Sequence, residues 1–287
     1  MSINNGDSDA QLAVRAAQAG AAVVRDLYGS RLARYDKSAG DFATEADLAA
    51  ERAILDALRS ARPDDAVTGE ESGRSGAAGA HRRWLVDPLC GTLNYAVRNM
   101  LVGVNVALRQ GPEVTAAATA DPFSGEVFWT DGEAAWVRRK DGTDERLTPW
   151  AGSALVDVNL DPPFPNAPGF RAVGLLADPV FAERFRPRVI SSTLAVAWVA
   201  AGRRAAYVTD GDLRDSVHFA AGIVLCWAAG CTVTGLYGEP VLSGAGGLLA
   251  AADAETHAAL LELVKSQRSE GSWSKEPSVK GRAYGPS

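Results

Sequence analysis

Two short acidic segments contain residues suited to binding a divalent cation. The segment DFATEAD holds Asp41, Thr44 and Asp47, and the segment TGEES holds Glu70 and Glu71. Carboxylate oxygens at the ends of strands or helices are the ligands that hard cations prefer. DFATEAD also has the pattern of a helix N-terminus, in which Thr44 caps the helix and the acids favour its dipole. DFATEAD therefore fits either interpretation, and each segment taken alone is weak evidence for a cation site.

A third segment, WLVDPLCGTLNY, adds a carboxylate next to a glycine turn. Its apolar residues 84–86 predict a buried strand that leads into Asp87, and Cys90, Gly91 and Thr92 follow. A carboxylate that a rigid strand delivers into such a turn is well placed to hold a cation. The backbone N–H groups of the Gly-Thr pair are suited to binding a phosphate, particularly where a helix begins.

The elements that position these segments follow from hydrophobic spacing and breakers. An amphipathic helix is predicted over residues 9–33 and a second over 44–60. Buried helices are predicted over 193–201, before Gly202, and from about 219 to 229. Strands separated by Gly, Pro and Asp turns are predicted at 84–88, 102–108, 114–120, 126–130 and 134–139, with hairpin turns at 123–126 and 141–145.

The order of these elements predicts one α/β (α+β) unit. No internal repeat and no obvious linker divides it, so we expect residues 1–267 to form one unit of two packed subdomains, about 1–150 and 151–267. Residues 268–287 are polar and rich in Gly and Pro, which predicts a disordered tail.

Composition narrows the class of protein. The 287 residues carry a net charge of −6, with 29 Lys+Arg and 35 Asp+Glu, so we expect no nucleic-acid partner. Three cysteines are too few for a disulfide scaffold and indicate a reducing compartment, and the first ten residues do not resemble a secretion signal. The uncharged stretch 216–237 contains glycines and a histidine, which favours a buried helix and strand over a membrane span. We therefore expect a cytoplasmic protein with no membrane association.

In their order along the chain, these motifs resemble those of the inositol monophosphatase family. The set is DxxTxxD, GEES, WxVDPxxGTxNY and a late helix with AAG, and the resemblance runs from about Lys37 to Ala252. It implies a layered αβαβα sandwich, usually a homodimer. It also implies Mg2+-dependent hydrolysis of a small phosphorylated metabolite such as a sugar, cyclitol or nucleotide monoester.

The resemblance assigns roles at a metal site, and two of its positions depart from the family pattern. It implies Glu70 and Asp87 as carboxylate ligands, with the carbonyl of Leu89 also facing a metal. The family motif DPLDGT is DPLCGT here, which places Cys90 where the second aspartate is usual, and the late WDxAAG is VHFAAG, which places His218 where the third is usual. Thiolate and imidazole suit Mn2+, Zn2+ or Fe2+ better than Mg2+.

The catalytic roles implied by the resemblance are retained. Asp47 and Thr92 match the pair that orients and deprotonates the attacking water, and Glu70 is a third catalytic candidate. The backbone amides of Gly91 and Thr92 would hold the phosphate. Acidic positions of two further family motifs are Ala205 and Ala228 here, which motivates the hypothesis of a specialised metabolic substrate.

These residues are compatible with three different functions. In the first, Glu70, Asp87, Cys90 and His218 form a remodelled metal site that still hydrolyses phosphate esters, with Asp215 as a further candidate ligand. In the second, Cys90 and His218 act as a nucleophile–base pair, with Asp87 or Asp215 orienting the imidazole. In the third, the protein binds a ligand without catalysis. The retained acidic and threonine residues favour the first.

Overall fold

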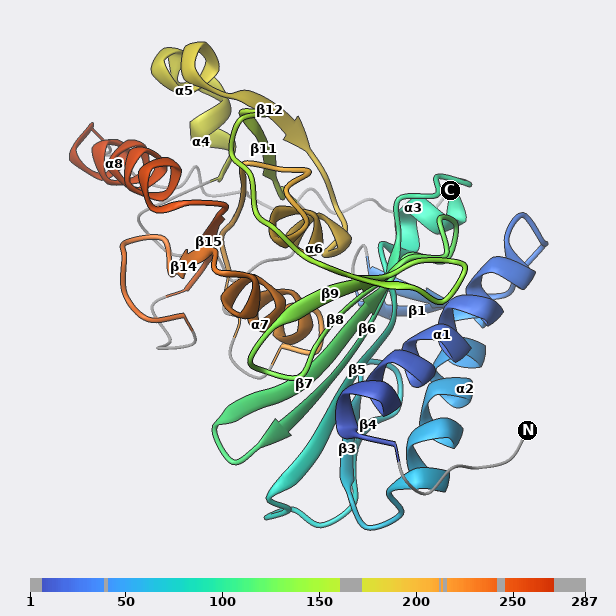
Figure 1. The fold of residues 1–287 in the computed structure, drawn as a ribbon. Coiled ribbons are helices and arrows are strands. Elements are labelled where there is room, and N and C mark those ends of the chain that lie inside the picture. The colour runs from blue at the N-terminus through green and yellow to red at the C-terminus, as the bar shows by residue number, and fades with distance from the viewer. Residues whose placement is uncertain are drawn as a thin grey trace, which may run out of the picture.

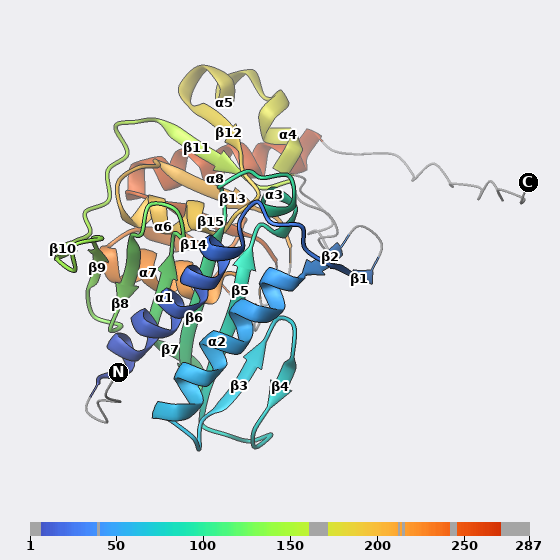
Figure 2. The ribbon, with the colours of Figure 1, turned by 90° about the vertical axis from the view of Figure 1, so that its right-hand side faces the viewer.

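Two β-sheets, each with helices on both sides, form the framework of the protein (Figures 1 and 2). The structure is a computed structural model, and it describes residues 7–38, 41–160, 172–211, 213, 216–241 and 246–270. Within these residues the larger sheet has eight strands, in the order β10 (Asp144–Arg146), β9 (Ala135–Arg138), β8 (Val127–Thr130), β7 (Glu113–Ala120), β6 (Gly103–Gln110), β5 (Arg82–Cys90), β3 (Ala66–Gly69) and β4 (Gly73–Ser75). The smaller has five, in the order β12 (Arg186–Val189), β11 (Leu155–Val158), β13 (Ala206–Thr209), β15 (Leu248–Ala251) and β14 (Thr232–Thr234). A separate hairpin joins β1 (Arg34–Ser38) and β2 (Asp41–Thr44).

The helices fill the layers outside and between the sheets. Helices α1 (Asp9–Leu27) and α2 (Glu45–Ala61) cover one face of the larger sheet. Helices α6 (Leu194–Ala200) and α7 (Ala220–Ala229) lie between the two sheets, and α4 (Ala172–Ala177), α5 (Pro179–Arg184) and α8 (Ala254–Glu270) lie on the far face of the smaller sheet. The short helix α3 (Thr92–Ala96) directly follows β5. The predicted α/β class and αβαβα layering are confirmed.

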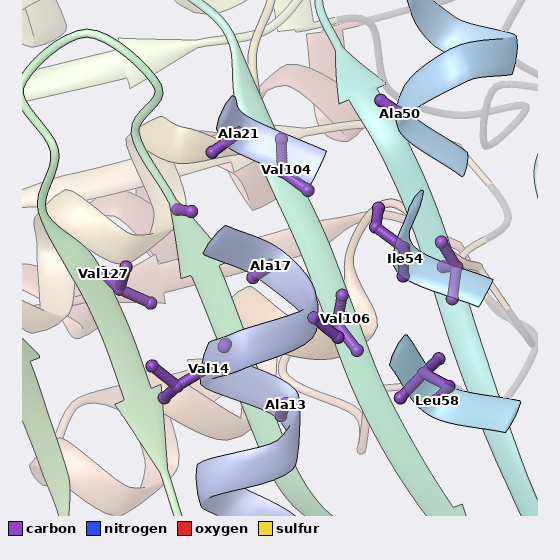
Figure 3. Packing of buried hydrophobic residues seen from close by; sticks show 14 of the residues in the cluster. Ala13, Val14, Ala17, Ala21, Ala50, Ile54, Leu58, Val104, Val106 and Val127 are labelled. Atoms are coloured by element: carbon purple, nitrogen blue, oxygen red, sulfur yellow. The ribbon is translucent and has the colours of Figure 1, made fainter. Parts of the chain in front are cut away.

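Small residues allow the outer helices to pack closely on the larger sheet. Ala13 and Ala17 of α1 belong to one buried cluster with Val104 and Val106 of β6 (Figure 3). A Cβ atom added at Gly20 would lie 2.7 Å from a side-chain carbon of Ile54 on α2, so α1 and α2 approach each other at a distance that a larger residue would not allow. This packing fixes α2, which carries two acidic side chains of the site.

Most predicted elements form, and the first helix ends earlier than predicted. The helix predicted over 9–33 ends at Leu27, because Tyr28 is extended, Gly29 has φ +77°, and residues from Arg34 onward pair in the β1–β2 hairpin. The remaining predicted helices and strands are found, and the predicted hairpin turns join β7 to β8 and β9 to β10.

The chain passes from the larger sheet to the smaller sheet between β10 and β11. The division into two subdomains, about 1–150 and 151–267, stays a prediction. Helix α8 runs to Glu270, into the segment predicted as a tail, and residues 271–287 lie outside the described part. The uncharged stretch 216–237 contains α7, a left-handed Gly230 and β14. None of the described helices is both long enough and apolar enough to cross a membrane.

Candidate active site

Asp87 lies at the centre of the candidate site, on a strand in the interior of the larger sheet. Its side chain is fully buried. The pairing of β5 with β6 shifts between Asp87 and Cys90, which accommodates Pro88, a residue that cannot donate to a strand ladder. The carboxylate accepts hydrogen bonds from the Leu89 amide (3.2 Å) and from Asn105 Nδ2 (3.3 Å). The bulge and these bonds fix the direction of the carboxylate.

Side chains from two distant segments meet around this carboxylate. Asp87, Cys90 and His218 each offer one donor atom, and these atoms all lie within 4.8 Å of one another. His218, which lies in the turn that leads into α7, places Nδ1 2.9 Å from Asp87 Oδ2 and 3.9 Å from Glu70 Oε2. Glu70 Oε2 is buried, and no N–H or hydroxyl group of the described residues donates to it. An orphaned carboxylate oxygen beside carboxylate, thiol and imidazole donors fits one divalent cation of the transition series.

The protonation of this group follows from burial and mutual charge. Burial and the neighbouring Asp87 charge raise the pKa of Glu70 to about 8. Burial opposes ionisation of Asp87 and His218, but their contact outweighs it: the imidazolium lowers the pKa of Asp87, and the carboxylate raises the pKa of His218 well above its usual value. Burial and Asp87 raise the pKa of the Cys90 thiol. Without a cation, the group therefore holds an Asp87–His218 ion pair and a neutral thiol at pH 7.

A second group, formed by Asp47 and Thr92, lies directly beyond the bulge. The Thr44 amide and hydroxyl both donate to Asp47 Oδ2, at 2.7 and 2.6 Å, in a capping box that begins α2. The other oxygen, Asp47 Oδ1, accepts a bond from Thr92 Oγ1 at 2.9 Å, and Leu89 O lies 3.2 Å from the same hydroxyl. The helix cap predicted for DFATEAD therefore forms through Asp47 Oδ2, and Asp47 Oδ1 is left to accept the bond from Thr92.

Gly91 connects the two groups. It has φ +104° and is the N-cap residue of α3, and a Cβ atom there would lie 3.0 Å from the carbonyl oxygen of Leu101 and 3.2 Å from that of Ser191. Only glycine fits both this left-handed conformation and this close backbone approach. The turn thus places the amides of Gly91 and Thr92, predicted to bind phosphate, directly after the candidate ligand Cys90.

Two charged residues that the sequence analysis did not assign hold the Glu70 loop. Glu51, on α2 and almost fully buried, accepts hydrogen bonds from the amides of Glu71 and Ser72, both at 2.8 Å. Lys37 Nζ lies 3.0 Å from Glu70 Oε1 and 2.7 Å from Glu71 Oε1. The position of Glu51, one helical turn after Asp47 on the same buried face, was a sequence signal for such a role.

We predict that the Glu51→Ala variant loses about 1–3 kcal/mol in its free energy of unfolding, because two backbone amides lose their acceptor. Urea denaturation measures the change, and Glu51→Gln should lose less because it keeps one acceptor oxygen. Asp56→Ala, an acidic residue on the exposed face of the same helix, is the matched control. Equal losses for Glu51→Ala and Asp56→Ala would contradict the role of Glu51.

Comparison with known proteins identifies the family of this chain. Residues 6–269 match the profile of the inositol monophosphatase family.

The chain belongs to the inositol monophosphatase family.

The relatives of this inositol monophosphatase family member include proteins named inositol-1-monophosphatase and proteins named Nus factor SuhB. It is 32% identical over 206 residues to an inositol-1-monophosphatase of Caulobacter vibrioides, covering 69% of this chain and 77% of that protein. It is 30% identical over 237 residues to Nus factor SuhB of Escherichia coli, covering 79% and 85%. The crystal structure of the extragenic suppressor protein suhB of Bartonella henselae superposes with a TM-score of 0.76 at 26% identity, over 89% of this chain and 97% of that one.

Inositol monophosphatase family members are metal-dependent phosphoric monoester hydrolases, typically with Mg2+, so the predicted family and enzyme class are confirmed. Of the other residues named from the sequence, Ala205 is buried beside β13, and Ala228 packs on the core at the end of α7. Asp215 lies outside the described residues.

Proposed function

We propose that this protein hydrolyses a small phosphate monoester at a remodelled centre, in which Asp87, Cys90 and His218, together with Glu70, hold a divalent transition-metal ion. The observation that carries the proposal is the convergence of the first three donor atoms within 4.8 Å. The unpartnered Glu70 Oε2 supplies a fourth candidate ligand. When bound, such an ion polarises phosphoryl oxygens and lowers the pKa of water.

The donor types favour ions other than Mg2+. Mg2+ demands oxygen ligands in nearly ideal octahedral geometry, and two family carboxylates are replaced here by Cys90 and His218. A sulfur and an imidazole nitrogen suit Zn2+, Fe2+ or Mn2+ better. Two unrelated replacements that can both bind metal argue for a changed ion preference rather than loss of the site.

The chain's own residues then position the reacting water and the phosphate. The Thr92 hydroxyl donates to Asp47, so its lone pairs face a water that it can hold in line with the phosphorus atom. Burial raises the pKa of Asp47, partly offset by its bonds to Thr44 and Thr92, which makes the carboxylate a better base than an exposed aspartate. The Gly91 and Thr92 amides bind the phosphate oxygens in this proposal.

The substrate class is a sugar, cyclitol or nucleotide monophosphate. Family membership and the inositol-1-monophosphatases among the relatives support this class. Alanine at 205 and 228, at acidic positions of the family motifs, supports a specialised metabolic substrate in preference to inositol 1-phosphate. As the family resemblance implies, we expect a homodimer, and light scattering on the purified protein checks the oligomeric state. We expect it to act in the cytoplasm.

Thiol chemistry is less well supported. Cys90 Sγ accepts a hydrogen bond from the Thr193 amide at 3.2 Å, and His218, which also contacts the thiol, has its Nδ1 paired with Asp87 at 2.9 Å. The pKa of the thiol is raised by burial, and the raised pKa of His218 leaves its imidazole protonated, so it cannot take the thiol proton. The purely ligand-binding alternative predicts no turnover with any ion.

The deciding experiment is phosphate release by metal-stripped protein from a panel of sugar, inositol and nucleotide monoesters. We expect faster turnover after adding back Mn2+, Zn2+ or Fe2+, the last under anaerobic conditions, than after adding Mg2+. Chelation should abolish the activity. Turnover that survives chelation but not alkylation of Cys90 would establish thiol chemistry, and the absence of turnover with every ion would favour a binding protein.

Restoring the family carboxylates tests the ion preference from the other side. The Cys90→Asp/His218→Asp double variant is expected to gain Mg2+-dependent phosphatase activity, because four carboxylates then face the site. The Cys90→Ser/His218→Asn variant, which changes the same positions without adding charge, is the control and should gain none. Mg2+ activity in the unaltered protein that exceeds that of the double variant would contradict the proposal.

A further inference from the structure

We propose that Asn105 is a positioning residue for the metal centre, which holds Asp87 directly and the Cys90 thiol through Thr193. This inference rests on the proposed function, because it concerns the same donor atoms. Asn105 touches no reacting group and lies behind the site on β6.

Asn105 makes its hydrogen bonds in a dry environment. It is about 1% exposed, near the middle of the apolar segment VGVNVAL, where a carboxamide is costly unless its polar atoms are paired. Its Nδ2 donates to Asp87 Oδ2 at 3.3 Å and to Thr193 Oγ1 at 2.8 Å. Its Oδ1 accepts a bond from the Thr119 hydroxyl of β7 at 2.8 Å. Both donors and the acceptor of one amide are thus used.

The orientation of this amide is determined by its neighbours. An ionised Asp87 only accepts hydrogen bonds, so the NH2 side of Asn105 must face it. The Thr119 hydroxyl then donates to the oxygen side and holds the plane of the amide. Thr119 is fully buried, and the two threonines on either side of the amide leave it a single favourable orientation.

Thr193 carries the effect of Asn105 to the sulfur. It precedes α6, and its backbone N–H donates to Cys90 Sγ at 3.2 Å while its hydroxyl oxygen accepts the bond from Asn105. Hydrogen bonds to a ligating sulfur and to a ligating carboxylate are the contacts that orient metal ligands and tune their donor strength. The Asn105 amide therefore positions two candidate ligands on β5. It holds Asp87 directly, and it holds Cys90 through Thr193, which precedes helix α6 between the two sheets.

Loss of this amide should weaken metal binding while leaving every ligand in the chain. Asp87 Oδ2 would keep its contact with His218 and lose the Asn105 donor to the same oxygen, so the carboxylate would be held by the imidazole alone on that oxygen and could rotate. Thr193 would lose the bond that holds its main chain over Cys90. Removing such supporting contacts typically costs about 10–100-fold in metal affinity.

The test is a Co2+ titration of metal-stripped protein, followed by the absorption that a Co2+–thiolate bond produces. We expect Asn105→Leu and Thr193→Val to bind Co2+ about 10–100-fold more weakly than the unaltered protein and with altered thiolate absorption. Thr193→Ser keeps the hydroxyl and should restore both. Gln110→Leu is the matched control, because Gln110 lies on the same strand and its amide also donates to a threonine hydroxyl, that of Thr115.

The outcomes separate this inference from the proposed function. Absence of thiolate absorption in the unaltered protein would overturn the metal centre itself, and this inference with it. Normal absorption there, together with unchanged affinity and spectrum in Asn105→Leu and Thr193→Val, would overturn only the role of Asn105. If circular dichroism shows that Asn105→Leu does not fold, the Thr193→Val and Thr193→Ser pair decides: equal Co2+ binding by both overturns the inference.

Discussion

The Asp87→Asn variant is expected to lose metal binding and, with it, on the order of a hundredfold or more of the metal-dependent turnover. Asparagine keeps the volume of the fully buried side chain but removes the charge that a cation requires. It also removes the partner of the His218 imidazolium, so the remaining donors lose their common centre. Isothermal titration with Mn2+ or Zn2+, together with phosphate release, measures both losses.

A matched surface variant separates loss of the ion from general damage. Asp144→Asn removes an aspartate whose carboxylate pairs with Arg138 at 2.7 Å on the outer strands of the same sheet. It should leave metal affinity and turnover unchanged. Asp87→Asn protein that folds, binds the ion as tightly as the unaltered protein and keeps its rate would show that the cation is held elsewhere.

The Thr92→Val variant is expected to lose about 10²–10⁴-fold in kcat while it keeps its affinity for the metal. Valine matches threonine in shape but has no hydroxyl, so Asp47 Oδ1 loses its bond and the water loses its orienting group. Because Thr92 is not one of the proposed ligands, titration with Co2+ should give the same dissociation constant as for the unaltered protein. Single-turnover kinetics of phosphate release measure the loss in the chemical step.

The control for this prediction is Thr143→Val. Thr143 lies in an exposed turn, and its hydroxyl bonds to Asp141, another aspartate, at 2.7 Å. Loss of turnover in Thr92→Val that is fully explained by weaker metal binding would place Thr92 among the residues that support the ion and would refute its role in orienting water.

Local sequence signals predicted the elements that position the site. The two residues of the capping box, Thr44 and Asp47, are only three positions apart, so the start of α2 could be predicted from the chain alone. The apolar strand before Asp87 and the Gly91 turn likewise carry their information within a few positions. The end of α1 was predicted wrongly because the apolar period continues beyond Leu27. The chain after Leu27 instead leads into β1, which pairs with β2, and β2 lies outside the segment 9–33 from which the helix was predicted.

The sequence by itself determined the family, the fold class and the identities of the candidate donor residues in this protein. Only the tertiary structure decided that Asp87 and His218, 131 positions apart, form an ion pair beside Cys90 and the unpartnered oxygen of Glu70. It also decided the role of Asn105, which from the sequence was one amide in an apolar strand. Capping, turns and strand alternation depend on neighbours in the chain. Distances among side chains from β5, β6 and the start of α7 depend on how two sheets and the helices between them pack together.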